Sequence, residues 1–495
     1  MPLSAASGSG ERNRSTTLTL SSRRSPPWFA KNWRRPKVRP VAIVGGGISG
    51  LAAAYQLAKA GLPCRVIERR PRLGGVIYTE TVEGCLIEGG PDSFLSAKPW
   101  AMDLIDELGL RGEVIGSNDH LRVTYVLRKG RLVPLPDGLM LMVPTRILPM
   151  LTTPLVGWST KLRMGLECLR TGGRVRTDDA SVADFIRDHY GQEAVDYLAE
   201  PLLAGVYGGD PEQLSVNSVL GTFAELERKY GSLSRGVLAA RRRMSSSRGS
   251  RTPLFQTLKS GLGALTEALH KACGSYLEVI QDEALAVERN SGGFRLRLSS
   301  AELAADHVVL ACPAYEAGKL LSELAPELAN DLKQIQYQSS VTVSLGYAKR
   351  GFDAPQDGFG FLVPKKERRR LVACTWVGTK FSYRVPDDKI LLRCFLNDEP
   401  LEDDETLVGI VCGELKRIMG LKATPLFSRV HRWPRSMAQY TVGHHRRVEA
   451  IMARAEALAG LYLAGNAYSG IGVPDCARMG REAAARIMAW QAGKQ

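Results

Sequence analysis

Three glycines and one glutamate near the start of the sequence have the spacing that holds a pyrophosphate group. Gly45, Gly47 and Gly50 follow the apolar run VAIV, and Glu68 ends a second apolar run, CRVIE, 18 residues after Gly50. This spacing permits a tight turn, a close approach of backbone to phosphate and close packing of helix on strand, while the acid accepts ribose hydroxyls. We therefore expect a dinucleotide here, with Gly50 leaving room for the pyrophosphate. Further contacts are expected from Ile48 and Ser49 at the helix N-terminus and from Arg69.

A second glycine-rich loop, LAGNAYSGIGVPDC, follows another short apolar run at 463–476. The helix after it supplies a second helix N-terminus, whose partial positive charge suits a phosphate or a flavin ring. Asn466 is expected near the pyrophosphate and ribityl chain, and Ile471 and Val473 against the flavin ring. A NAD domain rarely closes on two glycine loops so far apart, so the separation favours FAD.

The elements that must position these loops indicate an α/β fold. VAIV, CRVIE, HVVLACPA and LYLAGN are apolar runs typical of buried parallel strands, and LAAAYQLAKA is a helix of small residues. Residues 97–218 have a largely helical pattern, with Ser181 and Asp184 as a capping pair, whereas 319–435 is rich in strands. The expected architecture is a FAD-binding Rossmann-type domain with an inserted β-rich substrate domain and an inserted helical domain.

The expected boundaries follow from these patterns. They are a basic leader at 1–38, a FAD-binding domain at 39–95, 250–318 and 436–495, a helical domain at 96–218, and a substrate-binding domain at 219–249 and 319–435. Basic stretches at 241–251 and 365–370 are expected to be solvated loops, with a rim that attracts anions as the alternative.

The net charge is concentrated at the start of the chain. The formal charge is +15, and residues 1–40 hold nine basic residues and one acid, so this segment carries +8 and the rest +7. A nucleic-acid partner inferred from the total charge would mostly reflect the leader, and we expect none. The leader has transit-peptide composition, and a disordered leader or a start codon assigned too early explains it equally well.

The cysteines and the apolar runs indicate where in the cell the protein is expected to lie. Nine scattered cysteines without CxxC pairs indicate reduced core thiols, and no secretory signal is seen, so a cytoplasmic location is expected. The apolar stretch 138–158 contains Arg146 and three prolines, so it cannot be an ordinary spanning helix. It is either a pair of core helices or an apolar surface that rests on the inner face of a membrane.

Several strings spread along the chain resemble one family. Gly74 and Gly75 follow Glu68 as in the paired-glycine extension of FAD-dependent amine oxidases, although Val76 stands where Arg or Lys is usual. The strings EGGPDSF, EPLLAGVYGGDP, FQTLKSGLGAL, DGFGFLVP, WPRSMAQYTVGH and LAGNAYSGIGVPDC follow in order. From about residue 39 onward the chain therefore resembles the oxygen-dependent, FAD-containing protoporphyrinogen/coproporphyrinogen oxidases of haem synthesis, in their bacterial form.

The resemblance implies a reaction and its partners. A porphyrinogen would lose six hydrogens in three two-electron steps to non-covalent FAD, and dioxygen would reoxidise the cofactor to give hydrogen peroxide. No dedicated catalytic residue is expected, because the cofactor carries the chemistry. Peripheral membrane contact and a homodimer are further expectations of the family.

The resemblance also places residues at the substrate. The carbonyl of Gly205 faces it, Leu362 sandwiches a pyrrole ring and Trp376 is expected to supply the opposing aromatic face, a core position being the alternative for both side chains. A propionate-binding arginine falls in LRVTYVLRKGRLVPLP, where we expect Arg122, with Thr124 as the alternative. Further cofactor residues implied are Gly74, Gly75, Gly90, Pro91, Asp92, Ser93, Leu285 and Trp433.

Two other functions stay open at this point. A flavin amine oxidase or a carotenoid desaturase shares the glycine motifs, although Cys476 follows Pro-Asp and lacks the glycine-rich setting of a covalent flavin. A basic protein that binds a membrane surface or nucleic acid is supported only by the leader and the basic loops.

Overall fold

The computed structural model describes residues 39–140, 142–170, 178–246, 252–396 and 401–493, with side chains of 244–246 excepted. The expected leader, residues 1–38, lies outside the described residues. The account below concerns the unit from Arg39 onward.

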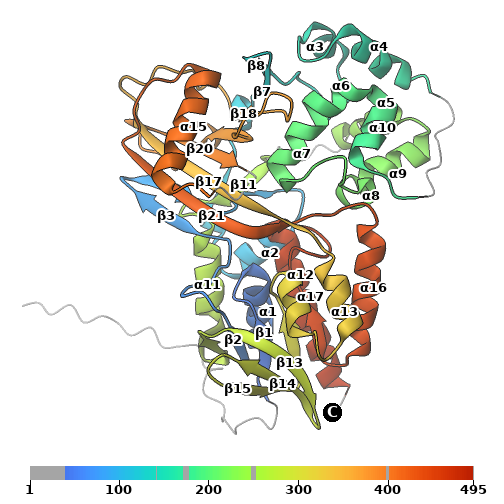
Figure 1. Ribbon diagram of the computed structural model, residues 1–495, viewed down its shortest axis with the longest axis vertical. Helices are drawn as coiled ribbons and strands as arrows, with labels where there is room; N and C mark the ends of the chain where they lie inside the picture. Colours follow the sequence, from blue (N-terminus) through green and yellow to red (C-terminus); the bar gives the residue numbers. More distant parts are fainter. Residues whose placement is uncertain (1–38, 141, 171–177, 247–251, 397–400, 494–495) are drawn as a thin grey trace, which may run out of the picture. The chain divides into compact units, whose positions relative to one another are not determined.

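A five-stranded parallel sheet forms the base of the expected cofactor domain (Figure 1). Its order is β12 (Leu277–Ile280), β2 (Cys64–Ile67), β1 (Val41–Val44), β16 (Val308–Leu310) and β22 (Leu461–Leu463). Every residue of β1, β16 and β22 is buried, as expected for strands covered on both faces. The four apolar runs predicted as parallel strands all lie in this sheet.

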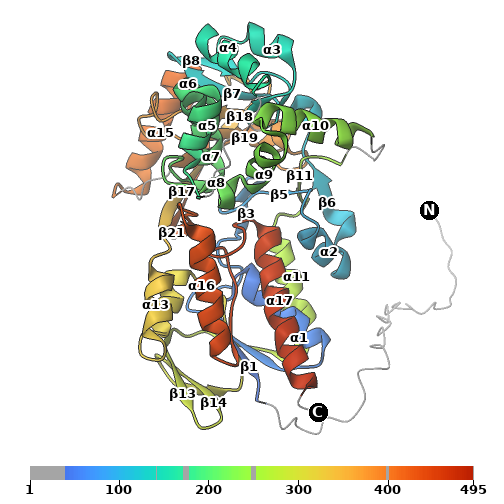
Figure 2. The ribbon, with the colours of Figure 1, turned by 90° about the vertical axis from the view of Figure 1, so that its right-hand side faces the viewer.

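Helices of small residues pack closely on the sheet. α1 (Ile48–Lys59) contacts both α11 (Gly263–Cys273) and α17 (Val473–Ala492) (Figure 2). β13 (Ala284–Asn290) and β14 (Gly293–Leu298) form a hairpin, which β15 (Glu302–Ala305) extends into a three-stranded sheet.

A seven-stranded sheet lies above the parallel sheet in the view of Figure 1. Its order is β21 (Phe427–Ala438), β17 (Tyr337–Ala348), β20 (Lys389–Leu396), β19 (Ala373–Trp376), β18 (Gly360–Leu362), β7 (Thr124–Arg128) and β8 (Arg131–Pro134). The largely helical pattern expected for 97–218 is therefore wrong for 124–134, which forms two strands. β7 pairs in parallel with β18, a partner far along the chain that local sequence does not reveal. α15 (Asp404–Met419) packs in the core on one face of this sheet.

The helical part has its own core. It comprises α3 (Ile147–Thr152), α4 (Trp158–Glu167), α5 (Val182–Tyr190), the π-helical turn η4 (Val195–Ala199), α7 (Glu200–Tyr207), α9 (Gly221–Tyr230) and α10 (Leu233–Ser246). The predicted cap of α5 is confirmed, because the Asp184 N–H donates to Ser181 Oγ at 3.0 Å. No described helix is long and apolar enough to cross a membrane.

The remaining elements are short or connect these layers. The helices are α2 (Trp100–Glu107), α6 (Gln192–Ala194), α8 (Val216–Val219), α12 (Ala314–Leu320), α13 (Pro326–Lys333), α14 (Val377–Lys380) and α16 (His444–Ala457). The strands are β3 (Thr79–Val82), β4 (Cys85–Glu88), β5 (Phe94–Leu95), β6 (Val114–Gly116), β9 (Leu139–Met140), β10 (Val143–Pro144) and β11 (Phe255–Leu258).

A buried histidine ties four helices of the helical part together. His189 Nδ1 in α5 lies 3.0 Å from Glu167 Oε1 in α4, and His189 Nε2 lies 3.1 Å from Glu227 Oε1 in α9. Glu167 also accepts from the N–H groups of Leu233, at 2.8 Å, and Ser234, at 3.0 Å, at the start of α10. His189, Glu167 and Glu227 are each 4% exposed. Paired and hydrogen-bonded burial is the condition under which such charges persist in a core.

Candidate cofactor and substrate site

The first glycine turn leaves an open space at the carboxyl edge of the parallel sheet. The Gly45 N–H donates to Ile67 O at 2.9 Å, and at its φ of +108° a Cβ would lie 2.7 Å from Ala311 O. A Cβ on Gly47 would meet only Gly75 Cα, at 3.9 Å. Gly47 therefore opens onto the N-terminus of α1, where a phosphate is favoured.

Gly50 has a different task from the one expected. A Cβ there would lie 2.0 Å from Gly45 O and 3.3 Å from Ile43 Cγ2, so this glycine lets α1 pack on the turn and on β1. The expectation that Gly50 itself leaves room for the pyrophosphate is thus corrected. A matching contact lies on the other side of α1, where a Cβ on Gly480 of α17 would fall 2.0 Å from Ser49 O.

Glu68 is held by the backbone at the end of β2. Its Oε2 accepts from the Gly46 N–H at 2.8 Å, and its Oε1 accepts from the Arg70 N–H at 2.9 Å. A carboxylate offers about four acceptor positions, so both oxygens keep capacity for ribose hydroxyls.

Arg69 and Leu285 border the same edge. Arg69 NH1 lies 3.5 Å from both Glu283 Oε1 and Glu316 Oε1, so the structure pairs this arginine with acids of the protein. Leu285 is 47% exposed and sits at an irregularity in the pairing of β13 with β14. An exposed leucine beside the acids suits the face of an adenine ring.

The paired glycines and the Gly-Pro-Asp turn pack on each other. The Gly74 N–H donates to Gly46 O at 2.8 Å, which joins the extension to the first turn. Gly75 has a φ of +61°. A Cβ on Gly90 would fall 1.8 Å from Val76 O, so only glycine fits at position 90. The Val76 that departs from the family pattern therefore contributes its carbonyl to this packing.

Asp92 points toward the seven-stranded sheet. It accepts from Lys380 Nζ at 2.8 Å and from Ser93 Oγ at 2.6 Å, and Arg393 NH1 lies 3.7 Å away. Burial acts to raise the pKa of Asp92, but Lys380 and Arg393 outweigh it and hold the pKa below its usual value. The carboxylate is thus an ionised internal partner, and the half-buried Pro91 beside it completes the turn.

The second glycine loop ends at the N-terminus of α17, and its asparagine is bonded within the protein. Asn466 Nδ2 donates to Ser436 O at 2.8 Å, and its Oδ1 accepts from Tyr337 at 3.4 Å. At the start of α17, Asp475 accepts from the Gly472 N–H at 3.3 Å and from Lys98 Nζ at 2.5 Å. Both ends of the Asn466 amide are therefore bonded within the protein, so a phosphate at this loop would have to be held by backbone N–H groups.

Three further predicted cofactor residues lie around this loop and the Gly-Pro-Asp turn. Ile471 is half-buried and Val473, the first residue of α17, is 7% exposed. Trp433 of β21 donates from Nε1 to Gly89 O at 2.7 Å, which ties the seven-stranded sheet to the turn.

The structure brings together two of the predicted substrate residues and separates a third. A Cβ on Gly205 would lie 3.3 Å from Leu362 Cδ2, so α7 and β18 face each other there. Gly205 is in the last turn of α7, whose carbonyls lack helical partners. Trp376 lies on the opposite face, with its ring 5.8 Å from Tyr125 in the core beneath α15. Strand alternation thus directs Trp376 away from Leu362.

The two candidates for propionate binding lie together beside β18. Arg122 is exposed, and among the described residues its side chain has no hydrogen-bond or ion-pair partner. Thr124 begins β7 opposite Gly360. The guanidinium of Arg122 is therefore available to an anionic ligand.

Tyr207, which the sequence reasoning did not single out, ends α7 two residues after Gly205. Burial and the charge of Asp475 raise its pKa to about 12. Gln439 Nε2 donates to Tyr207 O at 2.8 Å. The string AGVYGGDP contains this tyrosine beside Gly205, so the signal was present in the motif.

Comparisons with known proteins agree with this arrangement. The flavin containing amine oxidoreductase family matches residues 48–488. The coproporphyrinogen III oxidase of Bacillus subtilis is 35% identical over 90% of this chain and 96% of that protein, and the one of Propionibacterium freudenreichii is 33% identical, over 90% of each. A solved structure from Exiguobacterium sp. 255-15, assigned as a protoporphyrinogen oxidase, has a TM-score of 0.81, 31% identity and coverage of 91% and 99%. The glycine turns, the glutamate at the end of β2 and the whole-length matches agree, and the chain belongs to the flavin containing amine oxidoreductase family, among its porphyrinogen-oxidising relatives.

Proposed function

We propose that this protein oxidises a porphyrinogen to the porphyrin with dioxygen as the acceptor, using non-covalent FAD. The observation that carries the proposal is the match along nearly the whole chain to coproporphyrinogen III oxidases. Protoporphyrinogen oxidases such as that of Nicotiana tabacum are 29% identical. The higher identities of the Bacillus subtilis and Propionibacterium freudenreichii enzymes support coproporphyrinogen III as the preferred substrate.

The residues of the cofactor site divide into three tasks. The first glycine turn and α1 would hold the pyrophosphate, Glu68 the ribose, and the N-terminus of α17 the flavin end. When bound, the flavin supplies the two-electron redox chemistry and the route to dioxygen. Gly205 and Leu362 would hold the macrocycle between α7 and β18, and Arg122 would bind a propionate.

Non-covalent attachment is supported by the cysteines nearest the two glycine loops. Burial raises the pKa of both Cys312 and Cys476 to about 12, so each thiol stays protonated at neutral pH. A protonated thiol is a poor nucleophile toward a flavin. Denaturing the purified protein should release all FAD into the filtrate, and yellow colour left on the polypeptide would contradict this part of the proposal.

The catalytic test uses two substrates and one competitor class. Anaerobically prepared coproporphyrinogen III and protoporphyrinogen IX are offered with oxygen, and porphyrin fluorescence and peroxide are followed. We expect faster turnover of coproporphyrinogen III. Putrescine is the amine control, because putrescine oxidase shares the fold at 20% identity and a TM-score of 0.66. Turnover of the amine without turnover of either porphyrinogen would overturn the proposal.

A membrane contact is supported by α3 and α4. α4 has one buried face, formed by Thr160, Met164 and Glu167, and an opposite face that is apolar but open to solvent. The exposed apolar residues of the two helices and the turn after α4 are Ile147, Leu148, Leu151, Trp158, Leu162, Leu166 and Leu169. A large exposed apolar patch of this kind marks an interaction site. We propose that it rests on the inner face of the cytoplasmic membrane, as an interfacial helix does.

A further inference from the structure

A charged strap joins β18 to β19 and crosses onto the helical part of the protein. We define the strap as residues 365–370, KKERRR, which begin three residues after Leu362. We propose that the strap positions α7 against β18, and so sets the separation between Gly205 and Leu362. The proposal rests on the proposed function, because it concerns the same substrate contact.

The strongest contact fixes the N-terminal end of α7. Arg368 NH2 donates to Glu200 Oε1 at 2.7 Å, and the Lys365 N–H donates to Glu200 Oε2 at 2.9 Å. The side chains of Arg368 and Glu200 are 17% and 8% exposed. Arg368 also donates to Val363 O from Nε, at 3.1 Å, so the guanidinium is held on its own side as well. A shielded, hydrogen-bonded pair of this kind is strongly coupled to the position of both partners.

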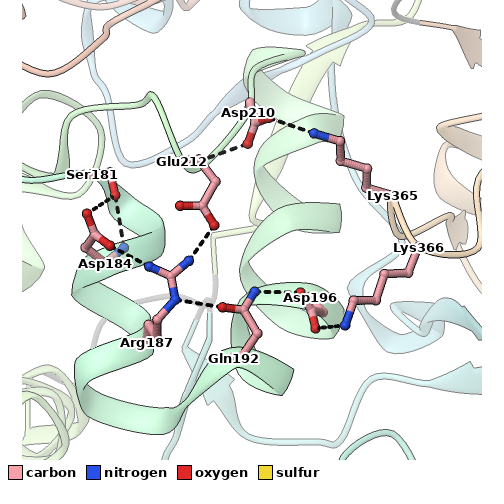
Figure 3. A network of polar contacts seen from close by, with 9 residues as sticks. All are labelled: Ser181, Asp184, Arg187, Gln192, Asp196, Asp210, Glu212, Lys365 and Lys366. Carbon is pink, nitrogen blue, oxygen red and sulfur yellow. Dashed lines mark hydrogen bonds and ion pairs between the residues drawn. The ribbon is translucent and has the colours of Figure 1, made fainter.

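Two lysines fix the far end of α7 and the turn before it. Lys365 Nζ lies 2.8 Å from Asp210 Oδ2, just past the end of α7, and Lys366 Nζ lies 2.5 Å from Asp196 Oδ2 in η4 (Figure 3). The two pairs border a pocket that also includes Gln192. Figure 3 shows the lysines reaching from the strap toward these helices on one side.

The strap also holds β7, the strand on the other side of β18. Glu367 Oε1 accepts from the Lys129 N–H at 2.6 Å, in the turn between β7 and β8, and from Tyr197 at 3.5 Å. The strap thus fixes α7 at both ends and β7 at its turn, with β18 between them. Four of its five cations, Lys365, Lys366, Arg368 and Arg370, are paired with acids of the protein, which disfavours the alternative that this loop is a rim for anions.

The consequence concerns the fit of the substrate. Gly205 lies on α7 between the two clamped ends, and a Cβ added there would meet Leu362 Cδ2 at 3.3 Å. Loosening one end of α7 would change the width of this contact. The glycine turns that would hold the flavin lie on other elements. Binding of the macrocycle should therefore weaken while flavin binding stays unchanged.

The test compares two arginines of the same strap. Arg368→Gln removes the pair with Glu200, and Arg370→Gln is the matched control, because Arg370 pairs with Glu402 and not with α7. We expect Arg368→Gln to raise KM for coproporphyrinogen III and the dissociation constant for coproporphyrin III about tenfold, the loss of part of one charge-assisted bond. We expect kcat and flavin content to change less than about twofold. A loss of substrate binding alone raises KM and leaves kcat unchanged, and the glycine turns that would hold the flavin lie on other elements.

A conservative variant and a charge exchange separate positioning from general damage. Arg368→Lys should recover most of the affinity. Lys365→Asp should weaken coproporphyrin III binding, and adding Asp210→Lys should restore it. Equal binding constants in Arg368→Gln and Arg370→Gln, or no restoration in the double variant, would overturn the inference. If wild type itself oxidises neither porphyrinogen, the proposed function fails instead, and the two failures are distinguishable.

Discussion

Replacing His189 with Gln should loosen the helical part of the protein specifically. Gln carries both of its donor hydrogens on one nitrogen and cannot replace donors on two separate ring nitrogens, so the change leaves the two buried carboxylates with one hydrogen bond fewer. Removing one partner of a buried ion pair costs about 3–5 kcal/mol. We therefore expect amide hydrogen exchange in α4, α5 and α9 to accelerate at least about 100-fold, because each 1.4 kcal/mol is a factor of ten.

The pH dependence of this loss has a definite sign. Burial acts to lower the pKa of His189, but the two carboxylates outweigh it and raise the pKa above its usual value. A raised pKa stabilises the fold below the unfolded value of about 6.5, and this contribution is lost as pH rises through the folded value. Burial acts to raise the pKa of Glu167, but its hydrogen bonds lower it to about 2, so its contribution is constant near neutral pH. The difference between wild type and variant should therefore be larger near pH 6 than near pH 9.

The assay is hydrogen–deuterium exchange read by peptide mass spectrometry, which resolves local opening in a chain with several cores. His445→Gln is the matched control, since His445 forms an exposed pair with Glu449 at 3.3 Å. Exchange is compared with this control at each pH, so that the intrinsic pH dependence of exchange cancels. Equal exchange in the two variants, or a difference that grows toward high pH, would refute the reasoning.

Three further outcomes are expected. Gly50→Val should abolish the visible absorbance of bound flavin, because a Cβ at this position already falls 2.0 Å from a backbone oxygen. The control Gly409→Val should keep the absorbance, because a Cβ there has nothing within 4 Å, and a yellow Gly50→Val protein would contradict the packing argument. Arg122→Ala should raise KM for porphyrinogen about tenfold at constant flavin content, and unchanged KM would assign the propionate to another residue. Leu162→Glu should release the protein from anionic vesicles in a sedimentation assay, whereas the similarly exposed Leu426→Glu should not, and equal sedimentation of both would remove α4 from the membrane contact.

The parts of the fold that depend on local pattern were predictable from the sequence. The strands before Gly45 and Glu68 are short, mostly apolar runs, the first ended by glycines and the second by charged residues, so both their type and their position followed from local chemistry. β7 and β8 pair with each other across a short turn at 129–130, so the sequence reasoning missed a local hairpin. The parallel pairing of β7 with β18, far along the chain, is a contact that no local periodicity reports.

The residues of the candidate site were likewise predictable from the sequence only in part. Gly205 and Leu362 were placed by motif and lie together in the structure. Trp376 stands in the apolar run LVACTWV, in which both strand faces carry apolar residues, so the run does not indicate which face meets the substrate. The bonds of Asn466 to Tyr337 and Ser436 likewise depend on tertiary contacts that no spacing predicts.

The contact between Gly480 and Ser49 has a consequence for biosynthesis. α1, the helix that follows the first glycine turn, packs against α17. β1 lies in the same sheet as β22, so both ends of this domain are needed before the sheet is complete. A ribosome adding about 5–20 residues per second needs roughly 20–90 s to travel from β1 to α17. Until residues 308–310 are made, β1 lacks its partner β16, and β16 in turn lacks β22 until residues 461–463 are made. The nascent chain should therefore acquire its flavin only after α17 has emerged, and a message truncated before α17 should yield colourless protein for degradation.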